Sequence, residues 1–144
     1  MTPNGRTTEF VRGSPLPLGA TSVRGGVNFS IYSKRASAVT LVVFSNGTAE
    51  PALEYPLHPK FHKTGDVWHC FLSGLDPGVH YAYLIDGLTL LDPYGKAVAG
   101  LPKWNTKAES PLRSVVADDR FAWGLIPGKR MKVRDRRRAT ASRR

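Results

Sequence analysis

The chain has 144 residues, 41% of them hydrophobic, which is the size and apolar content of one ordinary globular domain. It contains no run of about 18 apolar residues that would cross a membrane, and residues 1–10 lack the apolar stretch of a secretory signal. We therefore expect a cytoplasmic protein without a membrane partner. Cys70 is the only cysteine, which excludes an intramolecular disulfide and a cysteine-based metal cluster and predicts a small buried side chain on a strand.

The formal charge of +10 would indicate a nucleic-acid partner if the cations covered a folded surface. They are concentrated instead in residues 129–144, which hold nine Lys or Arg and one acid, whereas residues 1–128 hold twelve bases and ten acids. A segment this cationic and this poor in apolar residues cannot offset its ordering entropy, so we predict a disordered basic tail over residues 128–144. Nucleic-acid binding through the tail is one alternative function, although the tail has no aromatic residue for base stacking.

The first half of the chain predicts three strands. Residues 1–14 are polar and aperiodic, which indicates a flexible lead-in. In GVNFSIY, residues 26–32, apolar and polar side chains alternate as in a half-buried strand, and VTLVVF, residues 39–44, is typical of a central strand. The tripeptide Ser45-Asn46-Gly47 then predicts a turn, and a weaker strand follows at residues 53–57.

The second half predicts two further strands and their turns. Residues 64–66 form a turn into a strand over residues 67–72, and Leu75-Asp76-Pro77-Gly78 forms the next turn. The following strand, residues 79–85, places Val79, Tyr81, Tyr83 and Ile85 on one face and ends at Asp86-Gly87. We interpret these two strands as a hairpin.

Together these patterns predict an all-β fold. No stretch before residue 90 has apolar residues at helical spacing, and the 14 glycines and 11 prolines separate short strands. Short alternating strands must bury one face against a second sheet, so we predict an immunoglobulin-like β-sandwich over residues 15–90. Residues 91–127 lack a strand period and are interpreted as an extended connector that lies against another surface.

The sequence predicts no metal or cofactor site. His69 and His80 could lie on neighbouring strands, but no cysteine or second nearby acid completes a four-ligand set with either of them, or with His58 and His62. We therefore expect four surface histidines. The pair Gly25-Gly26 precedes a strand rather than a helix, so it predicts a bend and not a phosphate-binding loop.

An ordered series of motifs resembles the N-terminal module of isoamylases and glycogen debranching enzymes. The resemblance covers about residues 14 to 123 and lies in the order and spacing of the motifs rather than in any single one. The motifs are Pro15–Thr21, Gly26–Ser33, Val39–Phe44, His62–Leu72, Gly74–Gly78, Tyr81–Tyr83, Ile85–Gly87 and Leu90–Val98.

The resemblance implies a module of the carbohydrate-binding family forty-eight type, with an early-set immunoglobulin-like fold, ahead of a (β/α)₈ barrel of the α-amylase clan. Such barrels hydrolyse α-1,6 branch linkages of glycogen or limit dextrins. Residues 90–98 resemble the link towards the barrel, so Asp92, Tyr94, Trp104 and Trp123 are candidate contacts to that catalytic domain. Because residues 129–144 do not resemble the family, we expect a truncated or frameshifted product.

The chain itself is expected to hold no catalytic residue. Retaining glycoside hydrolysis needs two carboxyl groups about 5 Å apart on a rigid frame, and in this family they belong to the barrel. Asp86 in a turn and Asp92 before a proline occupy positions that favour Asp for backbone reasons. Asp118 and Asp119 point to opposite faces if they are extended, and we expect both to be solvated.

The partner implied by the resemblance is an α-glucan, glycogen or a starch-like polymer. Aromatic rings can stack on a sugar, and Trp68 and Tyr83 are the candidate contacts, although core packing is favoured for both because Tyr83 lies on the apolar face of its strand. Carbohydrate-binding regulatory relatives have tryptophans where this chain has residues 45–47 and Leu88-Thr89, and many debranching relatives have a long insert between Gly87 and Leu90. We therefore expect weak glucan binding by the module alone. A free-standing glycogen- or starch-binding domain is the second alternative to an accessory module.

Overall fold

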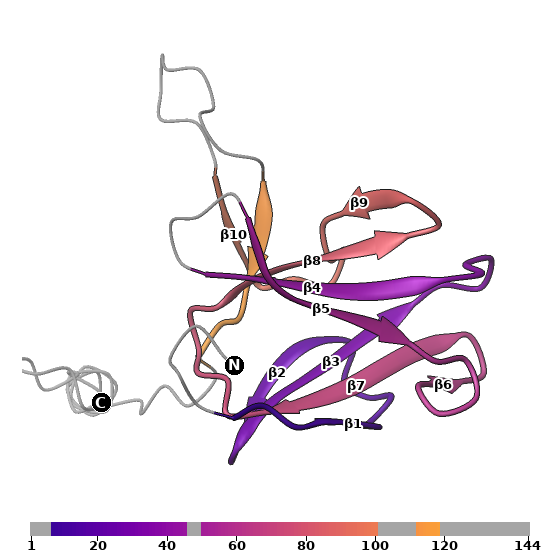
Figure 1. Cartoon of the computed structure of the whole chain (residues 1–144), viewed down its shortest axis with the longest axis horizontal. Helices are drawn as coiled ribbons and strands as arrows, with labels where there is room; N and C mark the ends of the chain where they lie inside the picture. The colour runs from indigo at the N-terminus through magenta and orange to yellow at the C-terminus, as the bar shows by residue number, and fades with distance from the viewer. Residues whose placement is uncertain (1–6, 46–49, 101–111, 119–144) are drawn as a thin grey trace, which may run out of the picture.

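The computed structural model describes residues 7–45, 50–100 and 112–118. Within these ranges all regular structure is β, and the strands form two antiparallel sheets packed face to face (Figure 1). The predicted all-β sandwich is confirmed. The described ranges contain no helix that is long and apolar enough to cross a membrane.

The first sheet contains the predicted strand over residues 26–32 at its centre. Its spatial order is β1 (Phe10–Val11), β7 (Val67–Ser73), β3 (Gly26–Tyr32) and β2 (Gly19–Val23), and β6 (Lys63–Thr64) pairs with the start of β7. β3 and β7 pair along seven positions, from Gly26 opposite Ser73 to Tyr32 opposite Val67. The predicted strands over residues 26–32 and 67–72 thus form the middle of this sheet.

The second sheet is built around the apolar VTLVVF strand. Its spatial order is β10 (Ala97–Ala99), β11 (Arg113–Val115), β8 (His80–Ile85), β4 (Val39–Phe44) and β5 (Pro51–Leu57), and β9 (Leu88–Leu90) pairs with β8. β4 lies between β5 and β8. Both of its faces carry buried apolar side chains: Leu41 and Val43 face the core, whereas Val42 and Phe44 belong to a separate buried cluster.

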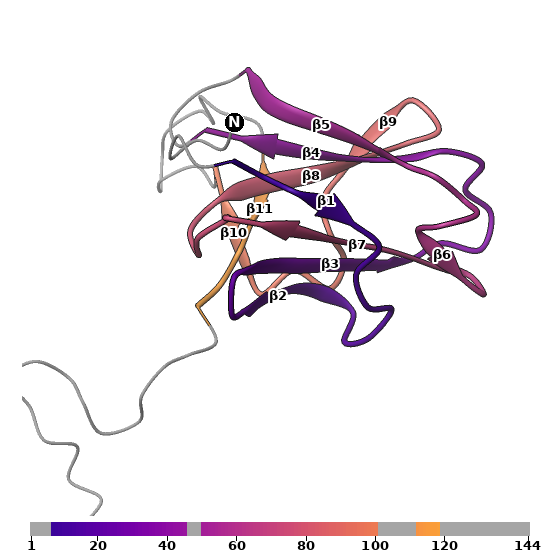
Figure 2. The same ribbon diagram turned by 60° about the horizontal axis from the view of Figure 1, so that its bottom comes forward.

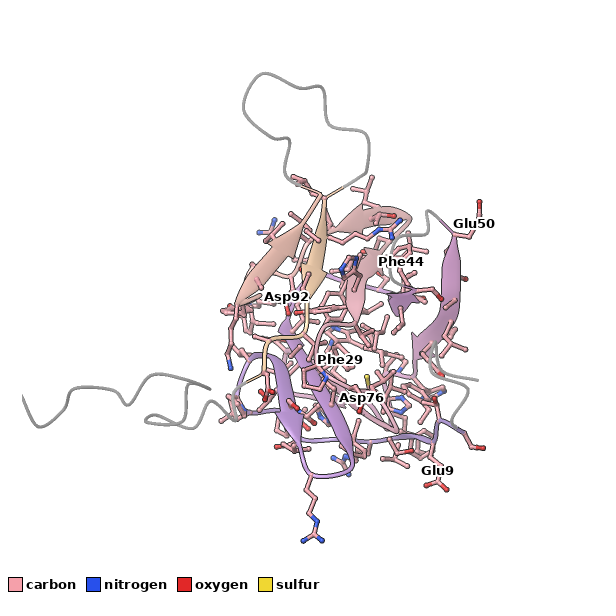
Figure 3. The ribbon with its side chains drawn as sticks, turned by 90° about the vertical axis from the view of Figure 1, so that its left-hand side faces the viewer. Glu9, Phe29, Phe44, Glu50, Asp76 and Asp92 are labelled. Carbon is pink, nitrogen blue, oxygen red and sulfur yellow. The ribbon has the colours of Figure 1, made fainter. Side chains whose placement is uncertain are left out.

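The core lies between the two sheets and consists of their inward-facing alternate residues. Figure 3 shows Phe29 in this layer, where its ring contacts that of Tyr81 edge to face across the sandwich, with 5.0 Å between ring centroids. Cys70 is fully buried among these residues, as predicted. The inward side chains of the four central strands are Val27, Phe29 and Ile31, Trp68, Cys70 and Leu72, Val39, Leu41 and Val43, and Tyr81 and Tyr83.

The predicted hairpin of residues 67–72 and 79–85 is wrong. β7 and β8 belong to different sheets, and residues 74–79 carry the chain from one layer to the other through Gly74 (φ 73°) and Gly78 (φ 92°). The alternation of apolar and polar residues predicts which face of a strand is buried. Two strands joined by a turn show the same alternation whether they pair in one sheet or lie in two facing sheets. The partner of each strand is set by long-range pairing, β3 for β7 and β4 for β8.

The hairpin of β8 is formed with β9 instead. Asp86 (φ 49°) and Gly87 (φ 86°) are its two loop residues, and positive φ at both positions is the geometry of a type I′ turn. The Asp86 carboxylate accepts hydrogen bonds from the backbone N–H groups of Ser37 and Ala38, at 3.0 and 2.8 Å. The predicted backbone role of Asp86 is therefore confirmed. Gly25 (φ 92°) forms the predicted bend between β2 and β3.

The sandwich extends beyond the predicted bounds of 15–90 at both ends. β1, from the predicted lead-in, pairs with β7, and β10 and β11, from the predicted connector, join the second sheet beside β8. These strands have two or three residues each, too few to show a period. The predicted basic tail at 128–144 lies outside the described residues.

One open side of the sandwich is closed by aromatic rings where the edge strands β1 and β5 face each other. The Phe10 ring stacks on Tyr55 with 4.9 Å between centroids and lies 4.6 Å from the His62 ring. Two hydrogen bonds join His58 and His62. The His58 backbone N–H donates to His62 Nδ1 at 2.9 Å, and the His58 carbonyl accepts the His62 backbone N–H at 2.8 Å. We call Phe10, Tyr55 and His62 the aromatic seam.

Candidate functional site

The other side of the sandwich is closed by the segment that resembles the interdomain link. The Asp92 side chain is 6% exposed, and Tyr81 in the core donates its hydroxyl hydrogen to Asp92 Oδ2 at 2.7 Å. The Asp92 N–H donates to Ser114 Oγ on β11 at 3.0 Å. Figure 3 shows Asp92 beside the β10–β11 pair. Tyr81, Asp92 and Ser114, which we call the link anchor, thus connect the core, the link and the last strand.

In the link anchor, the Tyr81 hydroxyl group keeps its proton. Burial raises the pKa of Asp92, while the hydrogen bonds from Tyr81 and from the Tyr94 N–H act in the opposite direction. Burial, followed by the nearby Asp92 charge, raises the pKa of Tyr81 as well. The tyrosine hydroxyl therefore stays protonated at neutral pH and serves as the donor to a buried carboxyl group.

The link packs closely around two glycines, and the one on β2, Gly19, has no room for a side chain. A Cβ at Gly19 on β2, where φ is 98°, would lie 2.8 Å from the Tyr94 carbonyl oxygen. A Cβ at Gly95 would lie 3.1 Å from the Asp92 carbonyl oxygen. The Tyr94 N–H donates to Asp92 Oδ1 at 2.8 Å, which is the local turn expected of Asp before a proline.

The four candidate contacts to a catalytic domain are therefore not equivalent. Asp92 points inward and its polar groups are engaged within the module, whereas Tyr94 is 41% exposed. Trp104 and Trp123 lie outside the described residues. Of the two described candidates, only Tyr94 has a side chain exposed at the surface of the module.

A second feature lies on the outer face of the second sheet. Val42, Phe44 and Ala82 are 5%, 7% and 1% exposed, with Leu84 packed against them. The Arg113 guanidinium of β11 stacks on the Phe44 ring, with its central carbon 3.6 Å from the ring centroid. The pKa of His80, which pairs with Phe44, is lowered by burial and then by the Arg113 charge. We call Val42, Phe44, Ala82, Leu84 and Arg113 the outer patch.

The positions where the resemblance implies a tryptophan in carbohydrate-binding relatives border the outer patch at opposite ends. Ser45 follows Phe44, and Leu88-Thr89 lies on β9, where Thr89 pairs with Leu84. Leu88 is 66% exposed and aliphatic. Among the described residues, the large aromatic side chains that are exposed are Tyr32, Phe61 and Tyr94, and no strand of this sheet carries any of them. The outer patch thus consists of buried apolar side chains with the Arg113 guanidinium over Phe44, and it presents no open ring.

The two candidate glucan contacts lie in the core. Trp68 and Tyr83 are each 1% exposed. The Trp68 Nε1–H donates to the Ser33 carbonyl at 3.3 Å, and the Tyr83 hydroxyl has no hydrogen-bond partner among the described residues. In this fold neither ring can stack on a sugar, and the core interpretation is the one that the burial supports.

The prediction of four surface histidines is wrong for two of them. His69 is 1% exposed, with Nδ1 at 2.8 Å from the Arg12 carbonyl and Nε2 at 2.8 Å from Thr64 Oγ1, and His62 is 9% exposed in the aromatic seam. Because both ring nitrogens of His69 are paired, the ring can be buried. His69 and His80 lie in different sheets, not on neighbouring strands. Within the described ranges no group of three or more His, Cys, Asp or Glu residues could hold a metal ion.

Among the described residues, the Asp side chains considered as candidates do not form the pair of carboxyl groups that glycoside hydrolysis needs. Asp86 binds backbone N–H groups at the β8–β9 turn, and Asp92 is engaged by Tyr81 and Tyr94. Asp118 is exposed, and Asp119 lies outside the described residues. Sequence reasoning missed Arg113 and Ser114 altogether. Their only signal was that polar residues interrupt an apolar run, which is not specific.

Comparisons with known proteins place these features in a family. The model of the carbohydrate-binding module 48 family, described as the isoamylase N-terminal domain, matches residues 17–95. Isoamylase SU1 of Zea mays is 37% identical over 121 residues, which cover 72% of this chain and 15% of that protein. The glycogen debranching enzyme of Salmonella typhi is 31% identical over 142 residues, covering 81% and 21%. The chain spans about a fifth or less of the length of these relatives.

Solved structures show the same fold at lower identity. The pullulanase SAP of group B Streptococcus, solved in complex with maltotetraose, gives a TM-score of 0.58 at 24% identity and covers 71% of this chain and 14% of that one. The catalytic module of the glycogen-degrading pneumococcal protein SpuA gives 0.57 at 20% identity, with coverages of 84% and 20%. At these identities the likeness shows the shared immunoglobulin-like sandwich and nothing about chemistry.

Proposed function

Because the chain belongs to the carbohydrate-binding module 48 family of isoamylase N-terminal domains, we propose that it serves as the accessory module of an isoamylase-like enzyme that hydrolyses α-1,6 branches of α-glucans. In this proposal the catalytic carboxylates are supplied by a barrel domain. The module packs on that domain and helps to orient branched glucan towards it.

The observation that carries the proposal is the link anchor. A segment that only tethered two domains would be expected to leave the module freely, but here the link returns to the core at Asp92 and continues as strands of the second sheet. A domain attached through such a link is held in a defined orientation, which supports a role in positioning. The exposed Tyr94 ring, fixed by the same turn, is our candidate contact to that domain.

The substrate class in this proposal is an α-glucan, glycogen or a starch-like polymer. The family name and the isoamylase and debranching relatives support it. The outer patch has no open aromatic ring, so we propose that glucan contacts are weak in the module alone and add to those of the catalytic domain. The compartment that we propose is the cytoplasm, since the buried free thiol of Cys70 suits a reducing environment.

A chimeric enzyme tests the positioning role. The N-terminal region of the Salmonella typhi glycogen debranching enzyme that matches this chain is replaced by this chain, and the same region is deleted as a control. We expect the chimera to debranch glycogen at least about tenfold faster than the deletion, because orientation of substrate and catalytic groups contributes that much or more. A folded chimera no faster than the deletion would contradict the proposal.

Affinity electrophoresis distinguishes the accessory role from a free-standing glycogen-binding domain. In gels that contain glycogen we expect the chain alone to be retarded little compared with a non-binding protein. Strong retardation at low glycogen concentration would favour the free-standing alternative. Release of reducing sugar by the purified chain would contradict both.

A further inference from the structure

A hollow of about 360 Å³ lies on the outer face of the first sheet, between β2 and the segment that follows β1. Three large aliphatic side chains that line it, Val11, Leu16 and Val23, are 46%, 67% and 41% exposed. The solvent face of an antiparallel sheet is normally polar, and a contiguous apolar area there is typical of an interface. We call this feature the apolar groove.

The chemistry of the apolar groove suits a protein surface better than a sugar. In its lining, Thr21 has a buried Oγ1 atom without a hydrogen-bond partner among the described residues. The neighbouring Asn28 amide is already engaged, since it accepts from the Ser14 N–H at 2.7 Å and donates to the Ser14 carbonyl at 2.9 Å. A sugar would need partners for several hydroxyl groups, whereas an apolar protein surface needs to offer one backbone group to Thr21.

The apolar groove begins where the link crosses β2. Ala20 faces the core. The alternate positions Gly19, Thr21 and Val23 therefore belong to the opposite face of β2. A Cβ at Gly19 would lie 2.8 Å from the Tyr94 carbonyl oxygen, which places the link over the start of this face, and Thr21 and Val23 line the groove further along it. The exposed residue Tyr94 and the groove thus follow one another along the same face of β2.

The described chain also leaves the module beside β2. The Val116 carbonyl accepts the Gly78 N–H at 2.8 Å, and the Gly74 N–H donates to the carbonyl of Gly25, in the turn after β2, at 2.8 Å. In Figure 2 the orange end of the described chain leaves at the side where β2 turns into β3. The chain matches the N-terminal domain of longer enzymes. We therefore expect the domain that follows in such an enzyme to lie on this side.

We propose that the apolar groove is the surface on which the catalytic domain of the parent enzyme docks, an inference that rests on the proposed function. An interface between domains covers about 600–1,500 Å², so the groove forms its apolar centre and Tyr94 lies towards its rim. The catalytic domain covers the side chains of Leu16 and Val23 and offers a backbone group to Thr21. Docking on this face leaves the outer face of the second sheet uncovered.

Thiol labelling tests this docking in the chimeric enzyme and in the chain alone. Leu16→Cys and Val23→Cys each place a thiol in the groove, and Leu88→Cys on β9, where the side chain is 66% exposed, is the matched control. Reaction with a maleimide is followed at each site by peptide mass spectrometry. Cys70 does not compete, because burial raises the pKa of its thiol far above the usual range.

We expect both groove thiols to react at least about tenfold more slowly in the chimera than in the chain alone, because a thiol reacts only while the groove is uncovered. Leu88→Cys should react at the same rate in both proteins. Groove thiols that react as fast in the chimera as in the chain alone would overturn the proposal. Slow labelling of the chain alone at high concentration would also overturn it, since a second copy would then be the occupant.

A charge in the groove provides a second readout. In the chimera that carries Leu16→Cys, we expect Val23→Glu to restore the labelling rate of the chain alone, because an unpaired carboxylate resists burial. Leu88→Glu should leave the labelling slow. If Val23→Glu has no more effect than Leu88→Glu, the groove is not the docking surface.

The debranching rate separates this inference from the proposed function. A chimera that debranches glycogen faster than the deletion, while its groove thiols react fast, would support the positioning role and reject this surface. Slow groove thiols in a chimera no faster than the deletion would support the docking surface and reject the positioning role.

Discussion

Two buried tyrosines on β8 have hydroxyl groups in opposite circumstances. The Tyr81 hydroxyl donates to Asp92, whereas that of Tyr83 has no partner among the described residues, although both rings lie in the core. Removing a donor from a buried acceptor destabilises, and removing an unpaired hydroxyl does not. The link anchor therefore depends on the oxygen atom of Tyr81, and the core depends only on the ring of Tyr83.

Matched substitutions test this difference. We expect Tyr81→Phe to lower the free energy of unfolding by about 1–3 kcal/mol, because Asp92 loses a hydrogen bond in a buried position. Tyr83→Phe should leave it unchanged or raise it by up to about 1 kcal/mol. Urea denaturation of both variants measures the difference, and equal losses would show that the Tyr83 hydroxyl has a partner.

His62 in the aromatic seam predicts a pH dependence. Its Nδ1 accepts the His58 N–H, so this bond requires the neutral ring. Burial lowers the pKa of His62, and the neighbouring His69, His58 and Arg12 charges act in the same direction. Since the folded pKa lies below the unfolded one, this stabilisation is fully present above the unfolded value of about 6.5 and is lost as the pH falls below it.

We expect the free energy of unfolding to decrease from pH 7 to pH 5. His62→Gln should flatten this decrease because a Gln side chain does not titrate, while its amide oxygen can still accept the His58 N–H. The pKa of His80 is also lowered, so His80→Gln should remove a separate part of the decrease. Urea denaturation at several pH values measures both effects. If the profile with His62→Gln matches that of the unsubstituted chain, His62 does not cause the dependence.

The strands differ in how far their own residues predict them. β3 and β4 have six or seven residues with clear patterns, and their predicted bounds are confirmed. The pairing of β7 and β8 was wrong because alternation describes a face and not a partner. β1, β10 and β11 are too short to carry a period, and they form because neighbouring strands offer free edges.

The β2–β3 hairpin gives a test at the level of one strand. A Cβ at Gly26 would lie 2.1 Å from the Leu72 carbonyl oxygen on β7, whereas a Cβ at Gly25 would meet nothing within 4 Å. We expect Gly26→Ala to cost about 3 kcal/mol through overpacking against the backbone. Gly25→Asn should cost no more than about 1 kcal/mol, since Asn tolerates positive φ. Thermal unfolding measures both, and similar costs would contradict the close approach of β3 and β7.

The sandwich has two closed sides of different character. The side between β1 and β5 is closed by the aromatic seam, and the opposite side, towards β2 and β11, by the link anchor. The sequence indicated the module and its link through ordered motifs, and it identified Asp92 as a turn residue. It could not show that Tyr81, in the middle of a strand, would bond to Asp92, because that contact depends on the link folding back onto the sheet.

The same limit explains the candidate glucan contacts. Trp68 and Tyr83 are candidates because they are aromatic residues on strands, but burial of an aromatic ring depends on which layer covers it. The outer patch was not predicted, since it needs Arg113 from β11 to stack on Phe44 from β4. Residues far apart in the chain make both features, so local patterns carry little information about them.

The proposed positioning role depends most on the link anchor holding the next domain in place. The measurement that tests this is the glycogen-debranching rate of the chimeric enzyme with Asp92→Ala, compared with Tyr83→Phe, at a temperature where circular dichroism shows both folded. We predict that Asp92→Ala lowers the rate by about tenfold or more, because misplacement by about 1 Å has effects of this size, and that Tyr83→Phe leaves it within about twofold of the unsubstituted chimera. Equal rates for the two variants would contradict the positioning role.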